Sequence, residues 1–258
     1  MIIDFARYSS VRIGGTFEVE VLREKCEFKG FIVGGANNLL ISPAPKNLGI
    51  LGEEFDFIKI LEQNKDFMIL HIGCATKSSS IHRFCKKKNL AGFEFLRKIP
   101  GLLGGILKMN AGLKDECISN NLLSITLAQK ELLKEQIPFA YRFCGIDELM
   151  FSAKFKAYFG FNHQKDELLK QARNNQPSGA SFGSIFKNPK GDFAARLIEA
   201  VGLKGFAKGE AMISDKHANF LINKKNASFE DAIFLIELAE KRVFEEFGIR
   251  LEREVVVI

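Results

Sequence analysis

Short apolar runs in the first half of the chain predict a sheet-rich region with a few added helices. Three strand-like runs are bounded mostly by Gly, Asn or Pro, and they cover residues 18–22, 30–33 and 68–72. Runs of this length between turn residues are typical of β-strands. Apolar residues then recur with helical spacing from Ser78 to Lys88. We expect Ser78 to be the N-cap of this helix and Asn89 to terminate it.

The last third of the chain has stronger helical patterns. A helix capped by Asp192 and closed by Gly202 carries apolar residues on one face. A longer helix follows, with Ser228 and Asp231 as a capping pair, a core stripe of apolar residues, and Gly248 at its end. The apolar faces of the two helices predict a second core in this part of the chain.

A polar segment and a closing strand delimit that last third. Residues 171–179 are polar and contain Pro and Gly, which is typical of a linker. Residues 249–258 alternate between apolar and polar, so we predict one strand here, with Glu252 and Glu254 on the same face.

Composition excludes several classes of protein. The chain has 258 residues, is 47% hydrophobic, and can bury one large core or two to three small ones. Its longest apolar runs are far below the roughly 20 residues of a membrane span. The N-terminus does not have the pattern of a signal peptide, so we expect a cytoplasmic protein. The five cysteines include no C-x-x-C pair, so we expect reduced thiols and no metal site.

The net charge of +6 leaves open what the protein binds. Lys and Arg are spread along the chain without the basic and aromatic alternation typical of nucleic-acid binding, and small anionic ligands fit equally well. The one basic run, residues 86–88, ends the predicted helix, where cations complement the helix dipole. We therefore expect no nucleic-acid partner.

Two glycine-containing segments are candidates for holding a cofactor. Residues 31–38 read Phe-Ile-Val-Gly-Gly-Ala-Asn-Asn, a strand followed by paired glycines whose N–H groups can hold a pyrophosphate. The alternative is a tight turn, and the segment is neither a G-x-G-x-x-G motif nor a Walker loop. Residues 99–112 are too rich in Gly for an ordinary helix or strand, which favours close approach by a cofactor over a self-packed loop.

Two further segments carry polar side chains next to apolar ones. Residues 179–189 offer a hydroxyl at Ser184, an ammonium and an amide, but no G-x-S-x-G elbow that would make the serine a hydrolase nucleophile. Residues 214–223 place His217 and Asn219 just before a predicted strand. These two side chains can face a ligand, or they can be a satisfied polar pair at a strand start.

The order of these segments resembles one family. Together with Val11-Arg12-Ile13-Gly14-Gly15, Tyr141-Arg142 and Leu251-Glu252-Arg253-Glu254-Val255, they resemble UDP-N-acetylenolpyruvoylglucosamine reductase from about residue 8 to 257. The resemblance implies an α+β fold, with a two-lobed FAD-binding domain of the vanillyl-alcohol oxidase type and a smaller α+β substrate-binding domain. Its expected parts are lobe 1 at residues 1–53 joined by 250–258, lobe 2 at 54–165, and the substrate-binding domain at 166–249.

The resemblance also assigns roles to residues. The catalytic set is Arg142, which stabilises the enolate, Ser184, the proton donor, and Glu254 opposite it. The residues implied to bind FAD are Gly34, Gly35, Ala36, Asn37, Asn38, Pro100, Gly101, Gly104, Gly105, Asn110, Ala111 and Gly112. Those implied or suggested to bind substrate are Tyr141, Lys187, Asn188, His217 and Asn219.

Departures from the family pattern affect individual contacts. Ala36 stands where serine is common, Ile106 where a small residue is usual, and Cys144 where Tyr-Arg-x-Ser is usual. The interval between Arg142 and Ser184 is short, which is similar to the compact subgroup of the family.

The activity implied by the resemblance is the NADPH- and FAD-dependent reduction of UDP-N-acetylglucosamine enolpyruvate to UDP-N-acetylmuramate for peptidoglycan. We expect non-covalent FAD, because neither glycine segment contains His or Cys, and we expect a monomer with a small-molecule substrate. Two alternatives remain, another flavin oxidoreductase of the same fold acting on an alcohol or hydroxy acid, and a flavin- or nucleotide-binding protein without turnover. The presence of all three catalytic residues argues against both alternatives.

Overall fold

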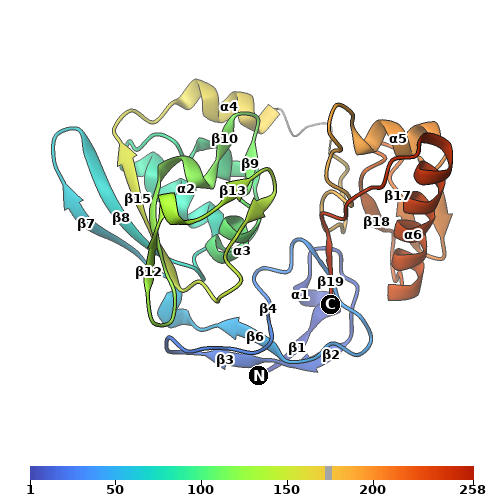
Figure 1. Ribbon diagram of the computed structural model, residues 1–258, viewed down its shortest axis with the longest axis horizontal. Coiled ribbons are helices and arrows are strands. Elements are labelled where there is room, and N and C mark those ends of the chain that lie inside the picture. The colour runs from blue at the N-terminus through green and yellow to red at the C-terminus, as the bar shows by residue number, and fades with distance from the viewer. Residues whose placement is uncertain (172–175) are drawn as a thin grey trace. The chain divides into compact units, whose positions relative to one another are not determined.

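The computed structural model describes residues 1–171 and 176–258, which form two compact units (Figure 1). Unit 1 comprises Met1–Val19, Ala36–Lys46 and Asn174–Ile258, and unit 2 comprises Glu20–Gly35 and Asn47–Arg173. Both units mix helices and strands, so the predicted α+β class is confirmed. The expected boundaries of two flavin lobes and a substrate domain stay a prediction.

A five-stranded antiparallel sheet forms the centre of unit 2. Its strands, in spatial order, are β12 (Glu131–Leu133), β11 (Leu122–Thr126), β15 (Ser152–Tyr158), β8 (Phe67–Gly73) and β7 (Ile58–Gln63). Alternate residues of β8, namely Met68, Leu70 and Ile72, are buried, as a strand with one face in a core requires. This confirms the strand predicted at 68–72.

Short helices pack against this sheet, and two predictions about them need correction. They are α2 (Ser78–Lys87), the 3₁₀ helix η2 (Glu94–Lys98), α3 (Leu103–Lys108) and α4 (His163–Gln171). The N-cap of α2 is Lys77, not Ser78, because the Ser78 hydroxyl donates to the Ile99 carbonyl at 2.5 Å. Asn89 does terminate α2, with φ at 58°. The expectation that residues 99–112 hold no ordinary helix is wrong, since α3 lies within them.

The other elements of unit 2 are short. A parallel sheet has the order β3 (Glu20–Leu22), β6 (Leu48–Leu51) and β4 (Phe31–Ile32), which confirms strands within 18–22 and 30–33. Two hairpins pair β9 (Gly112–Leu113) with β10 (Glu116–Cys117) and β13 (Phe139–Ala140) with β14 (Phe143–Cys144). Three 3₁₀ helices complete the unit, η1 (Glu53–Phe55), η3 (Ile118–Asn121) and η4 (Lys134–Gln136).

Unit 1 has its own core, built from segments far apart in the sequence. Its strands are β1 (Ile2–Asp4) with β2 (Thr16–Glu18), β5 (Leu39–Leu40) with β19 (Val256–Val257), and the sheet β16 (Ala207–Lys208), β17 (Ala211–Ile213), β18 (Leu221–Asn223). Its helices are α1 (Phe5–Tyr8), α5 (Ala194–Ala200) and α6 (Phe229–Phe247). Buried residues of α5 and α6 share one core with Phe182, Ile185 and Phe186, as their apolar faces predicted.

Capping explains the ends of α6 and corrects the start of α5. Ser228 and Asp231 form the predicted capping box, and Gly248 ends α6 with φ at 67°. The N-cap of α5 is Phe193 rather than Asp192. The Asp192 carboxylate accepts the Phe193 N–H at 2.7 Å and lies one residue too early to be the cap.

The closing strand is shorter than predicted. Only Val256 and Val257 are in a strand, and the chain bends at Glu254 and Val255. The cause is local, because the N–H groups of both Glu254 and Val255 donate to the carbonyl of Ile185, at 2.8 and 3.2 Å. Two successive donors on one acceptor break the regular ladder, as in a β-bulge.

Candidate active site

Ser184 and Glu254 lie on neighbouring backbone segments of unit 1. The Glu254 N–H donates to the Ile185 carbonyl at 2.8 Å, and the Lys187 N–H donates to the Glu252 carbonyl, also at 2.8 Å. A β-bridge joins Phe186 to Arg253 between these two bonds. The register therefore brings the predicted proton donor and its predicted partner to adjacent positions, although they lie far apart in the sequence.

The sequence around Ser184 explains why this segment is fixed. Gly183 adopts φ at 88°, a conformation that glycine takes without strain. Phe182 and Ile185 are 1% and 0% exposed and anchor the backbone in the core on both sides of Ser184. Ser184 itself is only partly buried. A partly buried serine on a backbone anchored on both sides is suited to meet a ligand.

Asn219 holds the Ser184 segment from behind. Its side chain accepts the Phe186 N–H at 2.9 Å and donates to the Phe186 carbonyl at 2.8 Å, and its backbone carbonyl accepts the Ile185 N–H. Asn219 is 4% exposed. Of the two interpretations left open by the sequence, this geometry supports the satisfied polar residue, and a substrate contact of Asn219 stays a prediction.

Two other candidate substrate residues of unit 1, Lys187 and Asn188, have defined partners, whereas a ring nitrogen of His217 has none among the described residues. The Lys187 ammonium pairs with Glu252 at 2.5 Å, and the Asn188 side chain accepts the Ala194 N–H at 3.1 Å, in the first turn of α5. The ring of His217 is half-buried, and burial lowers its pKa, which favours the neutral imidazole. Within the described residues its buried Nδ1 has no hydrogen-bond partner.

The loop at residues 34–38 is tied to the closing segment. The Asn38 side-chain amide donates to the Glu254 carbonyl at 2.7 Å, and the Asn38 carbonyl accepts the Val256 N–H at 3.0 Å. Ala36 is 2% exposed, has φ at 45°, and accepts hydrogen bonds from Ser10 through its carbonyl. A left-handed, buried alanine is strained, which is common near functional sites.

Protein packing explains several of the candidate glycines. Gly101 has φ at 122°. A Cβ on Gly104 would lie 3.3 Å from the Cys74 Cβ, and a Cβ on Gly112 would lie 2.0 Å from the Glu116 carbonyl oxygen across a hairpin. Gly101 and Gly112 are glycines for reasons internal to the fold, and Gly104 packs closely against Cys74.

Gly34 and Gly105 have no such explanation. Neither is in the left-handed region, and a Cβ on either would meet no atom of the described chain within 4 Å. At Gly105, inside α3, glycine costs roughly 0.5–1 kcal/mol relative to alanine. Close approach of a ligand to the backbone supplies a reason at both positions.

Arg142 lies in unit 2, in the turn between β13 and β14. Its guanidinium is 5.0 Å from the ring centroid of Tyr141, which is 56% exposed. Arg142 has φ at 55°, which is uncommon for a residue with a side chain. The Asn110 side chain donates to the Ala140 carbonyl at 3.0 Å and supports this turn.

Asn110 also has an unused acceptor. The residue is 8% exposed with φ at 39°, and its Oδ1 is buried without a hydrogen-bond partner in the described parts of the chain. A buried carbonyl oxygen without a donor is costly, so it points to a donor supplied by a ligand.

Sequence reasoning missed two groups of residues. Asn223 is 5% exposed, and its side chain donates to the carbonyls of Val11 and Arg12. It thereby fixes the Val11–Gly15 segment, in which Arg12 has φ at 56°. Because the partners lie near opposite ends of the chain, no local pattern could have indicated the contact.

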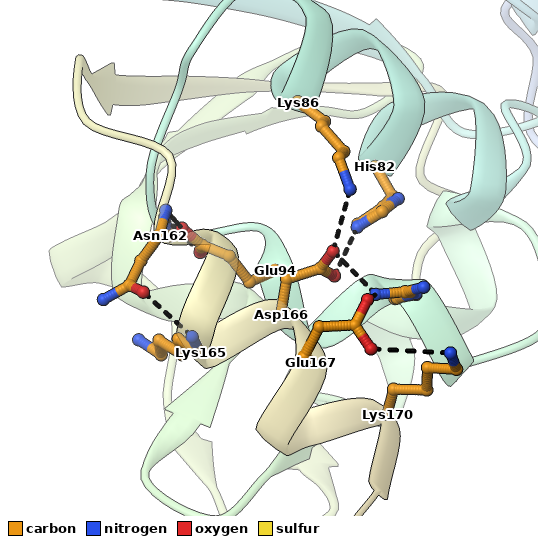
Figure 2. A network of polar contacts seen from close by, with 10 residues as sticks. His82, Lys86, Glu94, Asn162, Lys165, Asp166, Glu167 and Lys170 are labelled. Atoms are coloured by element: carbon orange, nitrogen blue, oxygen red, sulfur yellow. Dashed lines mark hydrogen bonds and ion pairs between the residues drawn. The ribbon is translucent and has the colours of Figure 1, made fainter.

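The second missed group surrounds Asp166 in unit 2 (Figure 2). The fully buried Asp166 carboxylate bonds His82 at 2.9 Å, Lys86 at 3.2 Å and Arg97 at 2.9 Å, so it ties α4 to α2 and η2. Burial raises the pKa of Asp166, but hydrogen bonds from His82 and Lys86 and the nearby charges outweigh it and hold the pKa below its ordinary value. The cluster joins α4 to α2 and η2, and both oxygens of the Asp166 carboxylate accept hydrogen bonds.

The part of the chain that the structure describes contains neither a metal-binding cluster nor a membrane-spanning helix. Among these residues, no group of three or more His, Cys, Asp or Glu is arranged to hold a metal ion. In the same residues, no helix has both the length and the apolar character needed to cross a membrane.

Comparisons with known proteins decide the family. Over all 258 residues, the chain is 71% identical to the UDP-N-acetylenolpyruvoylglucosamine reductase of Campylobacter jejuni strain RM1221, and both chains are fully covered. It is 45% identical to the protein of that name from Helicobacter hepaticus, covering 100% of this chain and 98% of the relative. The chain belongs to the UDP-N-acetylenolpyruvoylglucosamine reductase family. Residues 175–258 also match the family described as the C-terminal domain of this reductase.

A solved member of the reductase family has the same fold. The crystal structure of the enzyme from Thermus caldophilus aligns with a TM-score of 0.84 at 26% identity, covering 100% of this chain and 98% of that chain. The family resemblance seen in the sequence motifs is therefore confirmed over the whole chain.

Proposed function

We infer that the chain is an oxidoreductase that reduces the enolpyruvyl group of UDP-N-acetylglucosamine enolpyruvate in peptidoglycan synthesis, giving UDP-N-acetylmuramate. Family membership at 71% identity supports the reaction. The observation that carries the assignment to residues is the backbone register that makes Ser184 and Glu254 neighbours. We propose FAD as the cofactor, NADPH as the hydride donor, two FAD-binding lobes of the vanillyl-alcohol oxidase type, and a monomer.

The residues present fit a bound flavin. Gly34 and Gly105 leave open positions beside the backbone, and the buried Oδ1 of Asn110 is an acceptor that needs a donor. The neighbouring candidates Gly35, Ala36, Asn37, Pro100 and Ala111 complete the proposed FAD segments. When bound, FAD supplies the hydride chemistry that no amino-acid side chain can supply.

Arg142 is suited to hold the carboxylate of the enolpyruvyl group. Adding hydride to the methylene carbon leaves negative charge on the adjacent carbon and its carboxylate. A guanidinium is always charged and meets a carboxylate with two parallel N–H groups, so it stabilises this charge as it develops. The Asn110 bond to Ala140 and the Tyr141 ring help to fix its turn.

Ser184 is suited to give the adjacent carbon its proton. A serine hydroxyl is a weak acid in water, but an enolate is basic enough to take its proton within hydrogen-bond reach. Glu254, on the neighbouring segment, orients the hydroxyl or assists the transfer. Lys187, Asn188 and His217 would then contact the nucleotide sugar.

The test is to reduce the purified flavoprotein with NADPH and then add the UDP-enolpyruvyl sugar without oxygen. The sugar should reoxidise the flavin and give UDP-N-acetylmuramate, and acid precipitation should release the flavin into the supernatant. If alcohols or hydroxy acids reduce the flavin while the sugar does not reoxidise it, the alternative oxidoreductase is correct. A flavin that neither substrate affects would indicate a binding protein without turnover.

A further inference from the structure

Asn38 has a second task besides the one that the family resemblance implies. It lies in the proposed pyrophosphate loop, but its side-chain amide donates to the backbone carbonyl of Glu254 at 2.7 Å. Its own carbonyl accepts the N–H of Val256 at 3.0 Å. One residue of the loop thus holds the chain on both sides of Val255.

The closing segment needs such a support because its ladder is irregular. The Glu254 and Val255 N–H groups share the Ile185 carbonyl, and the regular strand resumes only at Val256. At this bend the Asn38 amide supplies the donor for the Glu254 carbonyl. Asn38 therefore holds the backbone carbonyl of Glu254, the residue whose side chain leaves the chain at this bend.

A salt bridge holds the other side of Glu254. Arg253 donates from Nε and Nη2 to the two carboxylate oxygens of Glu240 on α6, at 2.5 and 2.8 Å. This two-point geometry is the strongest that an arginine and a carboxylate form. Glu254 lies between this anchor on α6 and the Asn38 anchor in the loop, which are both in unit 1.

We propose that Asn38 is a positioning residue that sets the place of Glu254 opposite Ser184, so that the flavin loop and the proton-transfer pair form one coupled structure. The proposal rests on the proposed function for its catalytic consequence, but the coupling itself concerns the folded chain alone. A cofactor that orders residues 34–38 on binding would therefore also order Glu254. Because coupling between sites is reciprocal, a ligand that orders Glu254 would in turn strengthen cofactor binding.

Hydrogen exchange tests the coupling without catalysis. In flavin-free protein, Asn38→Ala should speed exchange at the amides of residues 254–256 by about 5-fold, since one hydrogen bond of ordinary strength is lost. Asn38→Asp keeps the size but replaces the donor by an oxygen, and should speed exchange at least as much. Asn226→Ala, at an exposed position of the same unit, is the control and should leave these amides unchanged.

A double-mutant cycle tests the catalytic consequence. With FAD added to saturation, Asn38→Ala should slow reoxidation by the sugar about 10-fold or more, and should slow it more than it slows flavin reduction by NADPH. Added to Glu254→Gln, the same change should have little further effect on reoxidation, because residues that act through one another are not additive.

Three outcomes separate the possibilities. Unchanged exchange at residues 254–256 together with weaker FAD binding would make Asn38 a cofactor ligand only and overturn the proposal. Full additivity in the cycle would also overturn it. If Glu254→Gln itself leaves reoxidation unchanged, the proposed role of Glu254 fails, while faster exchange in Asn38→Ala would still support the coupling.

Discussion

Replacing Asn219 by alanine distinguishes a structural residue from a substrate ligand. The change removes the acceptor of the Phe186 N–H and the donor to the Phe186 carbonyl. It leaves the backbone bond between the Asn219 carbonyl and the Ile185 N–H in place. The segment that carries Ser184 therefore loses two of its anchors while its connection to residue 219 remains.

The magnitude follows from burial. Each buried backbone group that loses its partner costs about 1–3 kcal/mol, so two groups cost about 2–6 kcal/mol. Phe186 is 1% exposed, so water has little access to the backbone groups that lose the Asn219 amide. The nearby Ser184 is partly exposed, which gives water some access and places the expected cost in the lower half of this range. We expect a loss of about 3 kcal/mol in the local opening free energy, which is roughly a 100-fold faster exchange of the Phe186 amide.

The assay is amide exchange at residues 184–186, with Asn226→Ala as the control, followed by the rates of the two half-reactions. Reoxidation by the sugar should slow, because Ser184 is no longer held in place, while reduction by NADPH should continue. Asn219→Asp keeps an acceptor for the Phe186 N–H and should show a smaller effect. Unchanged exchange combined with a raised KM for the sugar alone would refute this reasoning and make Asn219 a ligand.

Three other changes test the remaining assignments. Ser184→Ala should reduce its flavin with NADPH at a near-normal rate but lose roughly 10²- to 10⁴-fold in reoxidation by the sugar, and stopped-flow traces with equal losses in both steps would exclude the proton-donor role. Arg142→Lys should keep FAD but lose most of its turnover, since an ammonium cannot make the two-point contact, so near-normal turnover would place the enolate elsewhere. Asp166→Asn should destabilise unit 2 by about 3–5 kcal/mol at pH 7 in thermal unfolding, because Lys86 and Arg97 lose the charge of their buried carboxylate partner. Folding lowers the pKa of Asp166, so its contribution to the free energy of unfolding is present above the unfolded pKa and is lost as the pH falls through the folded pKa. A stability difference between wild type and variant that stays constant down to acid pH would contradict the pairing.

Local signals predicted the ends of helices where the capping atoms are close in sequence. The Ser228 and Asp231 capping box, Gly248 and Asn89 all act within one turn of their own helix. Ser78 shows the limit of such signals, because its hydroxyl bonds the distant carbonyl of Ile99 instead of capping its own helix.

Tertiary contacts explain what the sequence could not predict. The glycine content of residues 99–112 argued against a helix, yet α3 forms there, with Leu103 and Leu107 fully buried in the core. The predicted strand at 249–258 bends because Ile185 accepts two donors. The three proposed catalytic residues were named from motif order alone, but the Asn38 contact with the Glu254 carbonyl joins distant parts of the chain and has no sequence signature.

The pairing of β5 with β19 has a consequence for the order of folding during synthesis. All residues of unit 2 have been synthesised once Arg173 is added. The first two segments of unit 1, Met1–Val19 and Ala36–Lys46, are synthesised long before its third segment, Asn174–Ile258. Contacts between residues this far apart in the sequence form slowly, because the entropy cost of closing the intervening loop comes before the contact energy is gained. On the ribosome, Leu39 and Leu40 therefore emerge long before their partners Val256 and Val257. We expect nascent chains to expose this half-built core, to depend on chaperones at that stage, and to become resistant to protease in unit 2 first.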